Sequence, residues 1–178
     1  MFDYQRHFDA CCRNHRLPLR LSFAMPPGYE SANGMYDDAK KTVFVNAERL
    51  KSRPDAEQAF YLFHELRHAL QYCQPEDFGA LISRSLQYVI RYDGICYKQA
   101  DGQYLQCRLS GSSEYLMDLY LGQPHEADAN DFAYAQVKRL YGDSPELRRL
   151  RSFWSPRHPL SNSAYEAVYA EIDSKIKQ

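Results

Sequence analysis

The segment from Pro54 to Tyr72 constrains the fold more than any other, because its pattern is that of a long amphipathic helix. Proline is favoured in the first turn of a helix, and Asp55 and Glu57 would lie close to the positive end of the helix dipole. Apolar side chains then recur at intervals of three or four residues: Phe60, Phe63, Leu66 and Leu70. The segment therefore predicts a helix with one face buried in a core.

The middle of this helix carries an HExxH motif, His64-Glu65-Leu66-Arg67-His68. Residues four apart lie on one face of a helix, about 6 Å apart along its axis, so two imidazoles at this spacing can bind one zinc ion. Glu65 would lie beside the open position of the metal, where it can take a proton from bound water and later pass it to a leaving amine. The alternative is an amphipathic helix with two ordinary packed histidines.

Zinc needs a third protein ligand, and the sequence offers a candidate in the segment 124–135, PHEADANDFAYA. A third histidine of the metzincin type would fall six residues after His68, but Gln74 occupies that position. The other common arrangement uses a glutamate from a later helix, and Glu126 would lie in the first turn of one. Small residues would let that helix pack close to the HExxH helix: Ala127, Ala129 and Ala133. Favourable placement near a helix dipole is the alternative explanation for Glu126.

Other residues near these motifs are weaker candidates for the site. Asn130 lies on the same predicted helix face as Glu126 and can accept a hydrogen bond from a ligand histidine. Asp128 is a rival for this role, although two residues after Glu126 it would project away from that face. Three residues are candidates for stabilising an oxyanion, each with packing or solvent exposure as the alternative: Tyr72, Tyr134 and His158. We expect His125 to lie at the surface.

The chain before residue 50 predicts one helix and a small antiparallel sheet. The pattern of residues 2–16 is helical, and Pro18 would end this helix. Residues 19–25 alternate between apolar and other side chains, which predicts a strand with its apolar residues on one face. Two short strands joined by a polar turn are predicted to follow, at 35–36 and 42–46.

Apolar spacing and turn residues predict further helices and one hairpin in the second half of the chain. Gly94 and Gly102 favour an irregular hairpin in residues 92–107. Ser163 and Glu166 have the spacing of a capping box, which would begin the last helix. The other helices are predicted over residues 78–90, 112–122, 124–141 and 143–151. No repeat or linker is evident, so we expect one α+β domain over residues 1–178.

Composition excludes several other classes of protein. The 178 residues include 22 Lys and Arg against 23 Asp and Glu, a balance that argues against a general nucleic-acid binder. We interpret the basic stretch 138–158 as a solvated helix face. The five cysteines are odd in number and show no CxxC spacing, which argues against a zinc knuckle or a disulfide framework. The N-terminus has acids and bases where a signal peptide would be apolar, and no segment is apolar enough to span a membrane. We therefore expect a cytoplasmic protein.

The sequence HELRHALQ followed by PHEADANDFA resembles the ImmA/IrrE-type gluzincin metallopeptidases. The upstream stretch GMYDDAKKTVFVN is similar to the strand pair that precedes the active helix in that family. This resemblance implies a zincin-like, mini-gluzincin domain, in which a small antiparallel sheet packs on a helical bundle that bears the HExxH helix. It also implies zinc ligands at His64, His68 and Glu126, with Glu65 as general base. Arg67 is a departure, because a glycine commonly occupies this place in the family.

The resemblance also implies a function. Members of the family are cytosolic, are often carried on phages and mobile elements, and cleave transcriptional repressors. We therefore expect a zinc-dependent endopeptidase that hydrolyses a peptide bond in a specific protein, with a separate helix-turn-helix repressor as the candidate partner and no direct nucleic-acid binding. Two alternatives remain open: a zincin-fold binding or regulatory module without turnover, and a metal hydrolase that acts on a non-peptide amide or ester.

Overall fold

The computed structural model describes residues 2–100 and 102–176 of the chain. These residues form helices and two three-stranded sheets, which confirms the predicted α+β class. The chain divides into two compact units: the residues up to Pro75 with Asp128–Arg151, and Glu76–Ala127 with the residues from Ser152 on. Two of the boundaries fall within α-helices, one in α6 (Pro124–Tyr141) and one near the end of α7 (Pro145–Phe153). The expectation that residues 1–178 act as one domain stays a prediction.

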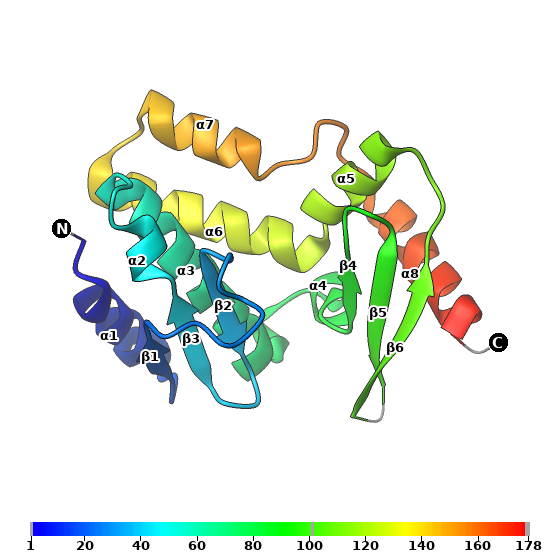
Figure 1. Cartoon of the computed structure of the whole chain (residues 1–178), viewed down its shortest axis with the longest axis horizontal. Helices are drawn as coiled ribbons and strands as arrows, with labels where there is room; N and C mark the ends of the chain where they lie inside the picture. Colours follow the sequence, from blue (N-terminus) through cyan, green and yellow to red (C-terminus); the bar gives the residue numbers. More distant parts are fainter. Residues whose placement is uncertain (1, 101, 177–178) are drawn as a thin grey trace. The chain divides into compact units, whose positions relative to one another are not determined.

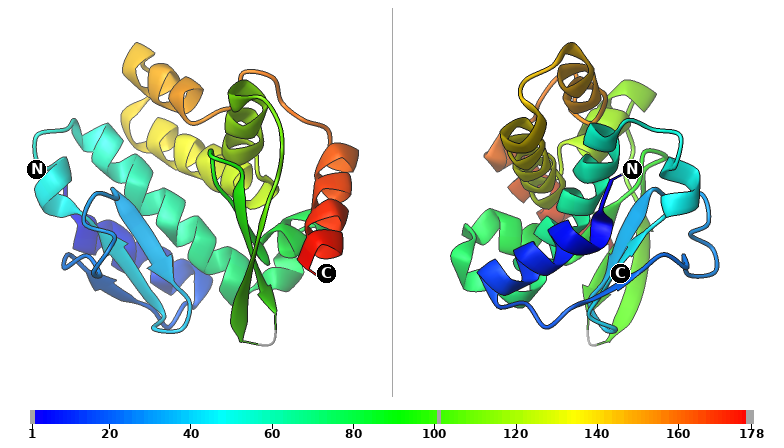
Figure 2. Two further views of the ribbon diagram at one scale, coloured as in Figure 1. Left: turned by 45° about the vertical axis from the view of Figure 1, so that its right-hand side comes forward. Right: turned by 90° about the vertical axis from the view of Figure 1, so that its left-hand side faces the viewer.

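The first unit is built around α3 (Asp55–Cys73), the helix predicted from residues 54–72. The helix packs against a sheet and against the first helix of the chain (Figure 1, Figure 2). The other elements before it are α1 (Tyr4–His15), β1 (Arg20–Ser22), β2 (Gly34–Asp37), β3 (Thr42–Val45) and α2 (Ala47–Leu50). All four residues of β3 are buried, as are the apolar side chains of α3 that the spacing predicted. This buried layer fixes the position of the HExxH motif.

The sheet of this unit is mixed, so the prediction of an antiparallel sheet is wrong. Its strand order is β1-β3-β2, with β1 parallel and β2 antiparallel to β3. Val43 on β3 lies opposite both Leu21 and Tyr36. The chain reverses direction once before β2 and again before β3, and β3 therefore runs in the direction of β1. The strand predicted over residues 19–25 also ends earlier, at Ser22.

Two helix ends of this unit depend on residues in the left-handed conformation. Helix α1 ends at His15, within one residue of the predicted range 2–16, and Arg16, with a φ of 54°, ends it in place of Pro18. Helix α6 is followed by Gly142, which has a φ of 81° and ends the helix as predicted. The chain then turns into α7 (Pro145–Phe153), which lies alongside α6 (Figure 1).

The second unit packs helices on an antiparallel sheet of strand order β4-β5-β6. Its elements are α4 (Ala80–Ser85), β4 (Tyr88–Ile90), β5 (Ile95–Ala100), β6 (Gln103–Arg108), α5 (Ser113–Leu121) and α8 (Asn162–Ile176), with a short 3-10 helix at Pro75–Asp77 before them. Tyr88 of β4 stacks on Tyr169 of α8 at 4.4 Å between ring centroids, in the middle of the core of this unit. The predicted hairpin in residues 92–107 is confirmed by β5 and β6, and the predicted helix over 112–122 by α5.

The helix predicted over residues 78–90 is confirmed by α4 in its first half and is wrong in its second half. It ends at Ser85, and Tyr88–Ile90 form a strand in which the first and last residues are buried and Val89 is exposed. Ile90 pairs with Cys96 of β5, and the side-chain amide of Gln123 bonds to both backbone polar groups of Ile90. These partners, which lie outside the predicted helix, decide in favour of a strand.

The capping box predicted at Ser163 and Glu166 is also wrong. Helix α8 begins at Asn162, and Ser161 Oγ accepts a hydrogen bond from the backbone N–H of Ala164 at 3.2 Å. Glu166 instead forms an ion pair with Arg84 of α4. The cysteines are all thiols, and among the described residues no helix is both long and apolar enough to cross a membrane.

Candidate metal centre

The HExxH helix directs two imidazoles at one point. His64 and His68 lie four residues apart on α3, with 3.0 Å between their Nε2 atoms and an angle of 88° between their rings. Glu126 lies in the first turn of α6. Taken one from each of His64, His68 and Glu126, the candidate ligand atoms lie within 4.8 Å of one another. The structure therefore brings together the three residues that the sequence predicted as ligands.

This group could hold a metal ion, and its spacing can be compared with that of a zinc site. Two nitrogens that bind one zinc ion tetrahedrally, each at about 2.0–2.1 Å, are separated by about 3.3 Å. The 3.0 Å between the two Nε2 atoms is close to this value. Two imidazoles and one carboxylate also form a donor set that leaves the fourth position of a tetrahedral zinc open.

Glu65 is buried beside the strand β2. Its side chain is 7% exposed and lies against Gly34, where a Cβ atom would be 2.8 Å from Glu65 Cγ and 2.9 Å from Oε1. Gly34 was not among the site residues predicted from the sequence. A glycine directly before the strand predicted at 35–36, upstream of an HExxH motif, was the available signal.

Asp128 belongs to the surroundings of the ligands, so the expectation that it projects away from them is wrong. Its carboxylate accepts hydrogen bonds from Arg67 at 2.7 and 3.0 Å and from Gln71 Nε2 at 2.8 Å. Gln71 Oε1 lies 2.9 Å from His68 Nδ1. The prediction failed because it considered only α6, whereas the partners of Asp128 lie on α3.

Arg67 and Gln71 were not among the predicted site residues. They are four residues apart on α3, so they share a face of the helix, and each is three residues after a ligand histidine. This spacing was the signal that could have identified them. The guanidinium of Arg67 also lies 4.9 Å from the centre of the Phe132 ring. These contacts give Arg67 a structural role on this face of α3.

His125 is largely buried, so the expectation that it lies at the surface is wrong. Its side chain is 12% exposed, and Ser85 Oγ lies 3.0 Å from its Nδ1 and 3.1 Å from its backbone nitrogen. Its Nε2 atom is 3.5 Å from Glu126 Oε1. The position of His125 on its helix gives no indication of the contact with Ser85, which lies at the end of α4. Asn130 is also buried on α6, and its role as a hydrogen-bond acceptor stays a prediction.

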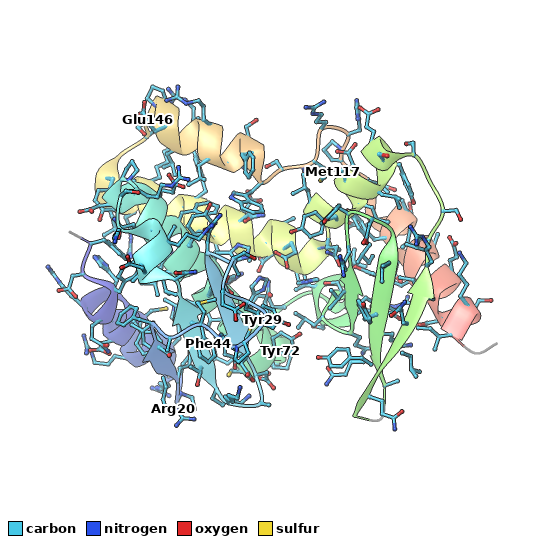
Figure 3. All side chains as sticks on the ribbon, in the orientation of Figure 1. Arg20, Tyr29, Phe44, Tyr72, Met117 and Glu146 are labelled. Atoms are coloured by element: carbon cyan, nitrogen blue, oxygen red, sulfur yellow. The ribbon has the colours of Figure 1, made fainter. Side chains whose placement is uncertain are left out.

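The three candidates for oxyanion stabilisation have different surroundings. Tyr72 lies near the end of α3, with its ring 5.9 Å from that of Tyr36 on β2 (Figure 3). Tyr134 is eight residues beyond Glu126, about 12 Å along the helix, and its hydroxyl donates to Asp143 at 3.2 Å. This placement corrects the expectation for Tyr134, which belongs to the corner between α6 and α7. His158 is 72% exposed and is held 3.0 Å from Asp118 in the second unit.

The basic stretch 138–158 has many of its charges paired. Arg148 and Lys138 both face Asp143, and Arg151 bonds to Asp131 at 2.8 Å. The paired side chains on α7 are largely exposed, with Arg149 at 71% and its partner Glu146 at 63%. Figure 3 shows Glu146 on α7. This arrangement favours the interpretation as a solvated helix face.

Comparisons of this chain with models of protein families, with curated proteins and with solved structures find no match. The likeness to the ImmA/IrrE-type family therefore rests on the sequence motifs quoted above.

Proposed function

We propose that this protein is a zinc-dependent peptidase with a zincin-like fold, similar to the ImmA/IrrE-type gluzincins. One observation carries the proposal: ligand atoms of His64, His68 and Glu126 lie within 4.8 Å of one another. The HExxH spacing adds a carboxylate, Glu65, directly after the first ligand. Two histidines, one glutamate and an adjacent buried carboxylate are the groups that metal-assisted peptide hydrolysis requires.

Each residue of the group has a distinct task in this proposal. His64 and His68 would hold the ion through their Nε2 atoms and Glu126 through its carboxylate. Zinc, when bound, supplies a Lewis acid that polarises the peptide carbonyl and makes water a better nucleophile. Glu65 would accept the proton of the attacking water and then donate it to the leaving amine. Gly34 leaves the space in which the Glu65 side chain lies.

The substrate in this proposal is a separate protein, with a helix-turn-helix transcriptional repressor as the leading candidate, and the reaction takes place in the cytoplasm. The family resemblance supports this part of the proposal. The nearly equal numbers of basic and acidic residues, 22 and 23, agree with a protein target better than with a nucleic-acid target.

Glu65→Gln tests the proposal, because it keeps the size of the side chain and removes its capacity to accept a proton. The zinc-loaded variant should retain its metal by mass spectrometry, whereas its cleavage of a random peptide library should fall by about 10²–10⁴-fold. Glu57→Gln is a matched control on the same helix and should cleave like the wild type. Equal cleavage by the wild type and Glu65→Gln would contradict the proposal. A zinc-loaded wild type that co-purifies with a specific repressor and leaves it intact would instead favour a binding module.

A further inference from the structure

A chain of hydrogen bonds connects the ligand His68 to an ion pair. It runs from His68 through Gln71 to Asp128, which is paired with Arg67. We propose that Asp128, held by Arg67, fixes the orientation of the Gln71 amide and thereby the tautomer of His68. This inference rests on the proposed function, because it concerns the same metal centre, and it assigns Gln71 and Asp128 as positioning residues.

The ion pair with Arg67 determines whether the Asp128 oxygens accept or donate hydrogen bonds. Arg67 Nε lies 2.7 Å from Asp128 Oδ2, and Arg67 Nη2 lies 3.0 Å from Oδ1. A guanidinium has only N–H donors and no acceptor, so Arg67 can only donate in this two-pronged contact. Asp128 is therefore an acceptor at both oxygens.

Because Asp128 only accepts hydrogen bonds, the side-chain amide of Gln71 can take only one orientation. The amide atom 2.8 Å from Asp128 Oδ2 must be the donor, Nε2. The opposite orientation would place the amide oxygen against a carboxylate oxygen. Since Gln71 is fully buried, solvent does not compensate for such a reversal. The amide oxygen therefore faces His68.

The amide oxygen in turn selects the tautomer of His68. Gln71 Oε1 lies 2.9 Å from His68 Nδ1 and can only accept, so Nδ1 must carry the proton. A neutral imidazole has one N–H, which leaves the lone pair on Nε2. That atom is 3.0 Å from His64 Nε2, on the side where the candidate ligands converge. His68 is thus prepared for metal binding before a metal arrives.

The tautomer can be measured directly in the metal-free protein. Long-range ¹H–¹⁵N correlation spectra distinguish a protonated ring nitrogen from an unprotonated one, at a pH above the ordinary histidine pKa of about 6.5. In the wild type we expect His68 with a protonated Nδ1 and an unprotonated Nε2. A His68 that is protonated at Nε2, or divided between the two tautomers, would overturn the proposal.

Two variants test the relay, and a third is their control. Gln71→Met keeps the volume and removes the amide, while Asp128→Asn lets the Gln71 amide take either orientation; both should produce a mixture of His68 tautomers. Gln58→Met is the matched control, because Gln58 is also a buried glutamine on α3, and it bonds to Tyr4 and to the carbonyl of Arg53. It should leave the tautomer unchanged. A wild-type tautomer in Gln71→Met or Asp128→Asn would overturn the relay.

Zinc affinity gives a second readout that does not depend on activity. Titration with zinc should show affinity about 10–100-fold weaker in Gln71→Met and unchanged in Gln58→Met. Equal affinity in Gln71→Met and the wild type, or equal loss in both glutamine variants, would contradict the relay. The two proposals fail separately: a wild type without zinc binding rejects the proposed function, and the tautomer in the metal-free protein still decides the relay.

Discussion

Glu65 on α3 lies directly against Gly34 on β2, and its side chain occupies the space that a side chain at position 34 would need. A Cβ atom at position 34 would lie 2.8 Å from Glu65 Cγ and 2.9 Å from Oε1. Distances under 3.0 Å require one of the two groups to move. The absence of a side chain on the strand is thus a condition for the observed position of the candidate general base.

Gly34→Ala should therefore displace Glu65 and leave the metal ligands in place. We expect kcat/KM for peptide cleavage to fall by about ten- to a hundredfold, because small errors in the position of a reacting group are costly. Zinc content should stay that of the wild type. Gly79→Ala is the control, because a Cβ atom there has no neighbour within 4 Å. A Gly34→Ala protein with wild-type kcat/KM would show that the position of Glu65 is not critical.

Gln123 should be important for the stability of the second unit. Its buried amide accepts from the backbone N–H of Ile90 at 3.1 Å and donates to the carbonyl of Ile90 at 3.2 Å. Gln123→Leu would leave two buried backbone groups without these partners, at about 1–3 kcal/mol each. Urea denaturation should show this loss in the free energy of unfolding, and the exposed Gln99→Leu should change it little. Equal stability of the two variants would contradict the assigned role.

Asp118 should make the stability of the protein depend on pH in the acid range. Burial raises the pKa of Asp118, but hydrogen bonds from the backbone of Arg157 and from His158 outweigh burial and lower the pKa overall. A carboxyl group whose pKa is lower in the folded than in the unfolded protein stabilises the folded state at pH values above its unfolded pKa, which is about 3.9. This contribution is lost as the pH falls through the folded pKa.

Asp118→Asn removes this titration. Compared with the wild type, the variant should be less stable at neutral pH, and its free energy of unfolding should fall less steeply below about pH 4. Denaturation curves measured between neutral and acid pH check both expectations. Asp77→Asn, at an exposed position, should follow the wild-type curve. An Asp118→Asn curve parallel to the wild type would show that Asp118 contributes no pH dependence.

The sequence was most informative where a long periodic pattern coincided with a clear start signal. Pro54 and the regular apolar spacing predicted α3, which begins and ends within about a residue of the expected limits. Gly142 ended α6 as predicted. Because helix geometry then sets the spacing of side chains, His64 and His68 could be placed next to each other from the sequence.

Residues whose position depends on partners outside their own segment were not predictable in this way. Residues 78–90 have apolar side chains at helical spacing, but pairing with β5 makes Tyr88–Ile90 a strand. The positions of Asp128 and His125 on the predicted helix indicated that Asp128 points away from the face of Glu126 and that His125 lies at the surface. Arg67, Gln71 and Ser85, which contact these two residues, lie far away in sequence. A pattern within one helix carries no information about such contacts.

Zinc binding tests the central claim most directly. Equilibrium dialysis followed by mass spectrometry should find about one zinc ion per chain in the wild type, as for a single His₂Glu site. The variants His64→Ala, His68→Ala and Glu126→Gln should each lose most of this zinc, and His15→Ala, outside the group, should retain it. A wild type that binds no zinc, or three ligand variants that bind it as the wild type does, would contradict the account.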